Sequence, residues 1–151
     1  MEIVRRDSVP AFVAPDKAII RELAASRNSS AKKQSLAEAT IAVGDSVTEH
    51  YHKVTEEFYY ILSGAGLMKI NDEEEQVSPG DTVIILPGMR HKITNNGTVP
   101  LVLLAVVRPS GRRKTMCLPS SAFGVRRHRM TVAGSVRIEY WVAPSATAST
   151  F

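Results

Sequence analysis

The sequence predicts an all-β protein built as one antiparallel sandwich or barrel. Between Ser35 and Val107, short runs rich in β-branched and aromatic residues recur about every 8–12 residues and end at turn signals. No amphipathic run of ten or more residues separates them, which argues against a βαβ architecture. The 151 residues are enough for one domain with its own hydrophobic core.

Most expected strands end at a turn signal that contains Gly, Pro or Asn, and the strand at residues 49–52 ends at a polar turn, residues 53–56. The expected strands are residues 35–43, 49–52, 57–62, 67–70, 76–77, 82–86, 91–94 and 101–107. The clearest turns are Gly44-Asp45, Ser63-Gly64, Asn71-Asp72, Pro79-Gly80-Asp81, Pro87-Gly88 and Asn95-Asn96-Gly97. This spacing places the whole barrel within residues 35–107.

The two flanks differ from this central region. Residues 1–34 are expected to form an extended or edge segment, within which residues 18–25 fit either a short helix or an edge strand. Residues 108–151 form a basic extension, in which residues 129–144 alternate in part and predict one or two strands. The rest of the extension is expected to be solvated, and its end, residues 145–150, to fray.

Charge is distributed unevenly along the chain. Residues 1–107 hold 11 basic and 14 acidic residues, a net charge of −3, whereas residues 108–151 hold 8 basic and one acidic residue, a net charge of +7. The pI near 9.4 therefore describes the extension, and we expect no nucleic-acid partner for the body of the protein. The basic cluster at residues 111–115 has no interleaved aromatic residues to stack on bases.

Three further features concern the compartment. No apolar run approaches 18 residues, so no membrane-spanning helix is expected. The N-terminal residues lack an apolar run followed by a small-residue cleavage site, which argues against a secretory signal. The single cysteine, Cys117, excludes an internal disulfide and a cysteine-based zinc cage. A cytoplasmic location is the expectation.

Histidines and one carboxylate form the most informative pattern in the sequence. His50 and His52 are two residues apart, so on a strand both imidazoles lie on one face. Glu57 begins the next expected strand, and His91 begins another after the Pro87-Gly88 turn. Side chains of this kind that converge inside a barrel would form a metal site with mixed nitrogen and oxygen ligands.

The spacing of these residues resembles the two signature motifs of the cupin superfamily. The first is Gly44-x5-His50-x-His52-x4-Glu57-x6-Gly64, and the second is Gly80-x5-Leu86-Pro87-Gly88-x2-His91-x3-Asn95. The second motif differs from the family pattern at Leu86, where the family usually has proline. This change is expected to make the turn less rigid without affecting the ligands. The resemblance covers about residues 35–107 and implies a small double-stranded β-helix, or jelly-roll, barrel. It also implies that His50, His52, Glu57 and His91 ligate a metal, whereas Asn95 and the glycines have structural roles.

Glu56 competes with Glu57 for the role of carboxylate ligand, since both spacings occur among cupins. The six residues between Glu57 and Gly64 fit the usual motif, whereas Glu56 would leave seven. Strand alternation also places Glu57, Tyr59 and Ile61 on one face and Glu56 on the other. We therefore assign the ligand to Glu57 and predict that Glu56 is a surface acid.

Three imidazoles and a carboxylate suit one divalent transition metal, Fe, Mn, Ni, Co, Cu or Zn, and the sequence does not choose among them. Alternation predicts an apolar cavity beside the metal, with Tyr59 and Met68 as candidate substrate contacts. Each of these two side chains could equally be ordinary core. No residue other than the ligands is an obvious general base.

The leading functional hypothesis is a metal-dependent enzyme acting on a small oxygenated molecule, as a dioxygenase, an isomerase, or a cyclase or decarboxylase. The alternative is a non-enzymatic module that binds a sugar or an organic acid through its metal, because the cupin fold hosts both classes. Small cupins commonly pair, so a homodimer is expected. Its contacts would involve edge strands and the terminal segments, including residues 1–15.

Overall fold

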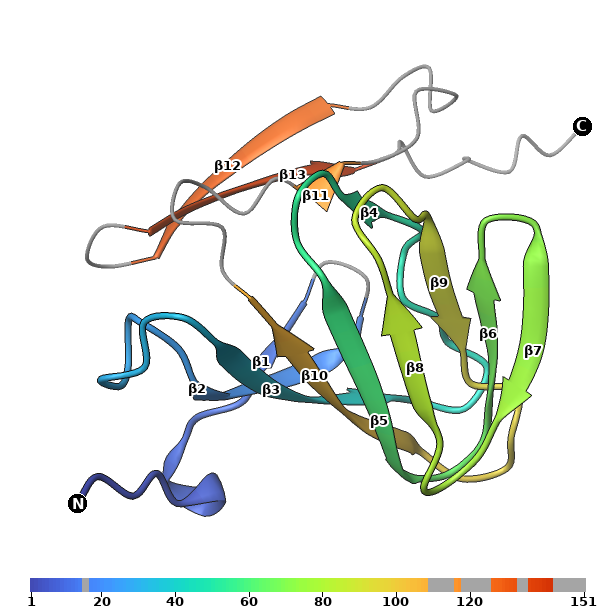
Figure 1. The fold of residues 1–151 in the computed structure, drawn as a ribbon, viewed down its shortest axis with the longest axis horizontal. Coiled ribbons are helices and arrows are strands. Elements are labelled where there is room, and N and C mark those ends of the chain that lie inside the picture. The colour runs from blue at the N-terminus through green and yellow to red at the C-terminus, as the bar shows by residue number, and fades with distance from the viewer. Residues whose placement is uncertain (15–16, 109–115, 118–125, 133–135, 143–151) are drawn as a thin grey trace, which may run out of the picture.

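The fold consists almost entirely of β-strands, as the computed structural model in Figure 1 shows. The structure describes residues 1–14, 17–108, 116–117, 126–132 and 136–142. Its elements, in chain order, are the 3₁₀ helix η1 (Arg6–Ser8) and the strands β1 (Phe12–Val13), β2 (Ile19–Ala24), β3 (Ser35–Ile41), β4 (Tyr51–His52), β5 (Glu57–Ser63), β6 (Gly66–Ile70), β7 (Glu73–Val77), β8 (Thr82–Ile85), β9 (His91–Thr94), β10 (Leu101–Val107), β11 (Met116–Cys117), β12 (Arg126–Val132) and β13 (Val136–Val142).

Two antiparallel sheets form the jelly-roll-like sandwich (Figure 1). The larger has the strand order β1-β2-β3-β10-β5-β8, and the smaller has the order β7-β6-β9. Single bridges at Ser46–Thr94 and His50–His91 attach the segment before β4 to β9. The sequence prediction of an all-β jelly-roll barrel is therefore confirmed.

The core lies between the two sheets and is formed by alternating residues of each strand. Its most completely buried apolar side chains are Ile41, Ile61, Ile85, Ile93, Leu101 and Leu103. Ala39, Leu103 and Ile61 occupy one cross-strand row on the inner face of the larger sheet. Burial of each large apolar side chain contributes about 2 kcal/mol, so this inner face is the main source of stability.

Two residues with predicted structural roles fix the end of the barrel remote from the ligands. Gly64 has φ of +80°, and a Cβ atom there would lie 2.6 Å from the Pro100 carbonyl oxygen, so only glycine fits this turn. Asn95 is fully buried, and its amide nitrogen donates to the carbonyl oxygens of Ile41 and Val99. Its side-chain oxygen accepts from the backbone N–H of Gly97, so this one side chain closes the turn at residues 95–99 and ties it to the end of β3.

The structure resolves one alternative and lengthens one strand. Residues 18–25 contain a strand, β2, rather than a helix, because this segment pairs with β3 from Ile19 to Ala24. Strand β7 begins at Glu73, three residues earlier than predicted. Its acidic residues have low β-propensity, and their cross-strand pairing with β6 decides their conformation.

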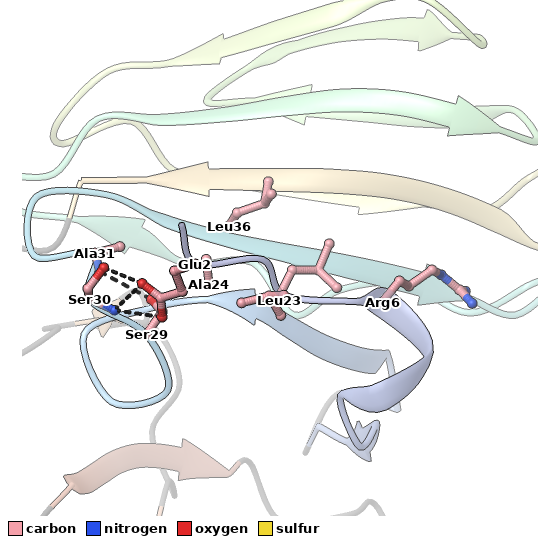
Figure 2. A pocket seen from close by; sticks show the side chains of 9 residues that line it. Glu2, Arg6, Leu23, Ala24, Ser29, Ser30, Ala31 and Leu36 are labelled. Carbon is pink, nitrogen blue, oxygen red and sulfur yellow. Dashed lines mark hydrogen bonds between the residues drawn. The ribbon is translucent and has the colours of Figure 1, made fainter.

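The N-terminal arm, residues 1–9, lies along the outer face of β2 and β3 (Figure 2). Arg6 makes a two-pronged ion pair with Glu38 of β3, at 2.7 and 2.8 Å. Arg21 of β2 donates to the carbonyl oxygens of Val9 and Arg6. A pocket of about 420 Å³ separates the arm from the sheet, with Val4, Leu23 and Leu36 among its walls.

Beyond β10, the chain forms the short strand β11, which pairs with β4, and the hairpin β12–β13. The hairpin agrees with the strands expected within residues 129–144. The predictions for residues 111–115 and 145–150 lie outside the described residues. Among the residues that are described, no helix is long and apolar enough to cross a bilayer.

Candidate metal centre

Four side chains from separate parts of the chain meet at one end of the barrel. They are His50, His52, Glu57 and His91, and their candidate ligand atoms all lie within 4.8 Å of one another. His50 and His52 flank the start of β4, Glu57 begins β5 and His91 begins β9. The structure thus brings together the four side chains that the sequence predicted as ligands.

Backbone pairing brings the three histidines together. The N–H of His91 donates to the carbonyl oxygen of His50 at 2.8 Å, and the reciprocal bond measures 3.1 Å. The N–H of Gly88 donates to the carbonyl oxygen of His52 at 2.7 Å, which ties the Pro87-Gly88 turn to β4. The ring centroids of His50 and His91 are consequently only 4.2 Å apart.

Two backbone carbonyl groups orient two of the rings. Nδ1 of His50 lies 2.8 Å from the carbonyl oxygen of Thr48, and Nδ1 of His91 lies 3.1 Å from that of Met89. A carbonyl oxygen can only accept, so in each neutral ring Nδ1 carries the proton and Nε2 presents a free electron pair. Such second contacts are what fix the tautomer of metal-binding histidines.

The donor set fits a cation. Nε2 of His91 is buried without a hydrogen-bond partner among the described residues, and it lies 3.3 Å from Oε2 of Glu57. The same carboxylate oxygen lies 2.8 Å from Nε2 of His52. Because Nδ1 of His91 donates to the Met89 carbonyl oxygen, the free electron pair on its Nε2 faces an electron pair of the Glu57 carboxylate. These two electron pairs repel each other unless a proton or a metal ion lies between them.

Burial and mutual proximity shift two pKa values at the site. Burial, reinforced by the neighbouring His91, lowers the pKa of His50 to about 4. Burial alone would raise the pKa of Glu57, but the hydrogen bond to the His52 imidazole outweighs it and lowers that pKa to about 2. At neutral pH the site therefore offers a neutral His50 ring and an ionised Glu57, the forms that bind metals.

The structure separates the two adjacent glutamates as strand alternation predicted. Glu57 is buried on the inner face of β5, whereas Glu56 is exposed. The three apolar residues that alternation places toward the interior, Tyr59, Ile61 and Met68, are buried, and the structure adds the buried Ile85 and the partly buried Ile70 and Val83. The ring of Tyr59 meets that of His91 edge to face, at 6.0 Å between centroids.

The two predicted substrate contacts have different positions relative to the ligands. The ring of Tyr59 contacts that of His91 directly. Met68 lies farther from the ligands, because it pairs with Ile93, two residues beyond His91 on β9. A role in binding substrate stays a prediction for both.

Sequence reasoning missed the orienting groups. The carbonyls of Thr48 and Met89 leave no side-chain signature, so no residue type could have revealed them. Asn71 was identified only as a turn residue, yet its side-chain oxygen accepts from the N–H of Arg90 and its own N–H donates to the carbonyl of Arg90. These two bonds hold the residue that precedes His91.

Comparison with known proteins places this geometry in a family. Residues 37–107 match the Cupin domain family. An uncharacterized protein of Methanocaldococcus jannaschii is 42% identical over 111 residues, which cover 72% of this chain and 89% of that protein. The tetracenomycin polyketide synthase protein TcmJ of Streptomyces glaucescens is 33% identical over 73 residues, which cover 48% of this chain and 49% of TcmJ.

Solved structures show the same fold. A predicted oxalate decarboxylase from Thermotoga maritima superposes with a TM-score of 0.66 at 25% identity, covering 72% of this chain and all of that structure. The polyketide cyclase RemF from Streptomyces resistomycificus superposes with a TM-score of 0.68 at 22% identity, covering 80% of this chain and 88% of RemF. The two signature motifs, the barrel and these matches lead to one conclusion: the chain belongs to the cupin superfamily.

Proposed function

We propose that this cupin binds one divalent transition metal, Fe, Mn, Ni, Co, Cu or Zn, through His50, His52, Glu57 and His91, and acts on a small oxygenated molecule. The observation that carries the proposal is the unpartnered, buried Nε2 of His91 beside the Glu57 carboxylate. When bound, the metal would supply Lewis-acid or redox chemistry in dioxygenation, isomerisation, or cyclisation or decarboxylation. Among the similar structures, a polyketide cyclase and a predicted oxalate decarboxylase support the cyclisation or decarboxylation part of this range.

The chain itself supplies binding, orientation and exclusion of water. Thr48 and Met89 hold two imidazoles in the tautomer that directs Nε2 toward the centre of the site. The buried aromatic ring of Tyr59 and the partly buried Ile70 and Val83 would restrict water near a bound substrate. Tyr59 is the side chain proposed to contact that substrate, with Met68 as a second candidate.

A second candidate function is a metal-containing binding module without catalysis, for a sugar or an organic acid. One observation favours it: an oxalate-binding protein of Thermotoga maritima is 34% identical over 76 residues, which cover half of this chain and 63% of that protein. The two functions share the metal and differ in whether the bound molecule is converted. A cytoplasmic location and a homodimer complete the proposal as sequence-based predictions.

Elemental analysis tests the metal first. The full chain, purified without added metal, is expected to carry about one equivalent of a transition metal, and a His50→Ala/His52→Ala double variant is expected to carry none. Circular dichroism of both proteins verifies that the variant is folded. Absence of metal from the folded wild-type chain, even after reconstitution with each of the six ions, would refute the proposal.

Incubation with small molecules then separates enzyme from binding module. The loaded wild-type chain is mixed with hydroxy acids, dicarboxylates and sugar phosphates, and product formation is followed by mass spectrometry beside binding by calorimetry. Conversion that the double variant lacks supports the enzyme. Metal-dependent binding without conversion supports the binding module.

A further inference from the structure

A charged pair lies on the inner face of the larger sheet, away from the candidate ligands. Glu22 of β2 is two residues from Ile20, which packs against the core, so both side chains lie on the same side of the sheet. Arg21, between them, points outward and donates to carbonyl oxygens of the N-terminal arm. Oε2 of Glu22 is buried and forms an ion pair with Nε of Arg27, in the loop after β2. A carboxylate with its own cation therefore lies on the inner face.

The register of the sheet connects this pair with the candidate metal centre. The inner row that begins at Glu22 passes through Ala37 of β3 and Ala105 of β10 and reaches Tyr59 of β5. The four strands lie side by side in this order (Figure 1). Tyr59 in turn meets the ring of His91. One row of the sheet thus leads from the charged pair to the candidate ligands.

Small residues keep the middle of this row accessible. Ala37 and Ala105 are half-buried although they face inward, whereas Leu103 in the next row is 1% exposed. Three strand spacings separate Glu22 from Tyr59, about 14 Å between their backbones, and side chains from both ends reach into this distance. A chain of about six carbon atoms, roughly 8 Å long with its terminal oxygen atoms, would bridge the two ends over the alanines.

The charges of the pair decide what it can bind. The carboxylate of Glu22 cancels most of the charge of Arg27, so a second anion would gain little there. Among the described residues, Glu22 is the partner of the Arg27 side chain, which leaves the N–H groups at the tip of the guanidinium as donors. A hydroxyl group donates and accepts at once, so neighbouring hydroxyl groups match a carboxylate beside a guanidinium.

A hydrogen-bonded turn holds Arg27 in place. The side-chain oxygen of Asn28 accepts from the N–H of Ala25, and its nitrogen donates to the carbonyl oxygen of Glu22, both at 2.7 Å. The N–H groups of Asn28 and Ser29 donate to the carbonyl oxygen of Ala25. These bonds set the loop beside the end of β2, so the pair is formed before a ligand arrives, which lowers the entropic cost of binding.

We propose that Glu22 and Arg27 form a subsite for the hydroxyl groups of a polyhydroxylated acid whose other end binds at the metal. The inference rests on the proposed function, because it places the second end of the same substrate. Hydroxyl groups at the far end would donate to the Glu22 carboxylate and accept from the Arg27 guanidinium. Within the small oxygenated molecules, this subsite selects polyhydroxylated acids over dicarboxylates and over acids with an apolar tail.

Calorimetry with three six-carbon probes tests the selectivity. Gluconate, 2-hydroxyhexanoate and 2-hydroxyadipate share an α-hydroxycarboxylate end, and their far ends carry hydroxyl groups, a bare alkyl chain and a carboxylate, respectively. The wild-type chain, loaded with its metal and kept under nitrogen, is expected to bind gluconate at least about tenfold more tightly than either other probe. Hydrogen bonds to charged groups account for a difference of this size.

Variants of the pair locate the origin of the selectivity. Arg27→Gln is expected to lower the affinity for gluconate to that for 2-hydroxyhexanoate. Glu22→Gln should shift the preference to 2-hydroxyadipate, because it leaves the guanidinium unpaired. The matched control is Lys33→Gln, which removes an exposed charge from the same loop and should keep the wild-type order. Should the buried Glu22→Gln variant fail to fold, Arg27→Gln decides the matter, since the Arg27 side chain is 34% exposed.

Metal content and circular dichroism, measured on every sample, distinguish failure of the subsite from failure of the metal centre. A loaded wild-type chain that binds the three probes equally, or prefers 2-hydroxyadipate, would overturn the subsite and leave the proposed function intact. So would a preference for gluconate that Arg27→Gln preserves. A folded wild-type chain that takes up no metal would overturn both.

Discussion

Two buried carboxylates on opposite faces of one sheet have different partners. Glu57 lies on the inner face beside the imidazoles of His52 and His91. Glu38 lies on the outer face beside the guanidinium of Arg6. Their exposed fractions are nearly the same, at 5% and 8%. Burial by itself therefore does not distinguish a candidate ligand from a structural acid.

The chemistry of the partners makes the distinction. A guanidinium is always charged and offers a fork of N–H donors, so the ion pair at Glu38 is complete as it stands. An imidazole carries no permanent charge, and Nε2 of His91 lies beside Glu57 without a hydrogen-bond partner among the described residues. The Glu57 carboxylate therefore lacks a permanently charged partner, and a cation can supply one.

The largest effect should come from removing the inner carboxylate's charge. Glu57→Gln is expected to weaken metal affinity at least about 100-fold, because it removes an anionic ligand from the site. Glu56→Gln is the matched control, since the adjacent side chain is exposed and should change the affinity less than about twofold. Competition with a chelator measures both. If Glu56→Gln were the damaging change, the register of β5 would be wrong.

The next largest effect concerns pH and the metal-free protein. His50 has its pKa lowered from 6.5 to about 4, so the unfolded chain binds more protons between these values and stability falls as pH drops through that window. The loss is on the order of 3 kcal/mol. Glu57, with its pKa lowered from 4.5 to about 2, adds a further loss below about pH 4.5.

Urea unfolding of the metal-free chain between pH 7 and pH 4 measures this dependence. A His50→Gln variant should lose most of the slope above pH 4.5, because glutamine does not titrate. Stability that stays level over this range in the wild-type chain would contradict the assignment of His50 as a buried, neutral imidazole.

The outer carboxylate should matter for folding and not for metal. Glu38→Gln is expected to destabilise the chain by about 2 kcal/mol, because Arg6 and Arg21 lose their charged partner. The metal affinity should stay the same, since the side chain is on the other face of the sheet. Unfolding and metal titration of the same variant give both quantities. A drop in metal affinity comparable to that of Glu57→Gln would remove the contrast between the two carboxylates.

The smallest effect is expected where neither carboxylate is touched. Leu86 occupies the position at which cupins usually have proline, is exposed, and precedes the turn that leads to His91. Leu86→Pro should raise the free energy of unfolding by about 0.5 kcal/mol, because proline lowers the conformational entropy of the unfolded chain, and should leave metal affinity unchanged. Thermal unfolding resolves the difference. Weaker metal binding in this variant would show that the turn, and not the ligands alone, limits the site.

The sequence by itself determined the all-β class and the face on which each strand residue lies, and its resemblance to the cupin motifs implied which four side chains converge. Strand alternation is a local property with a period of two, so it separates Glu57 from Glu56 without knowledge of any partner strand. The turn residues are equally local, as Gly64 with its positive φ illustrates. These features depend on covalent geometry and short-range sterics, which the sequence carries directly.

Only the tertiary structure decided features that depend on partners distant in sequence. Pairing with β3 selected strand over helix for residues 18–25, and pairing with β6 brought the acidic residues of β7 into a strand. The carbonyls of Thr48 and Met89 orient two imidazoles, and Arg6 accounts for the burial of Glu38. Backbone groups are the same in every residue, and the Arg6–Glu38 pair spans 32 positions. Residue types and short spacings contain no signal for either kind of contact.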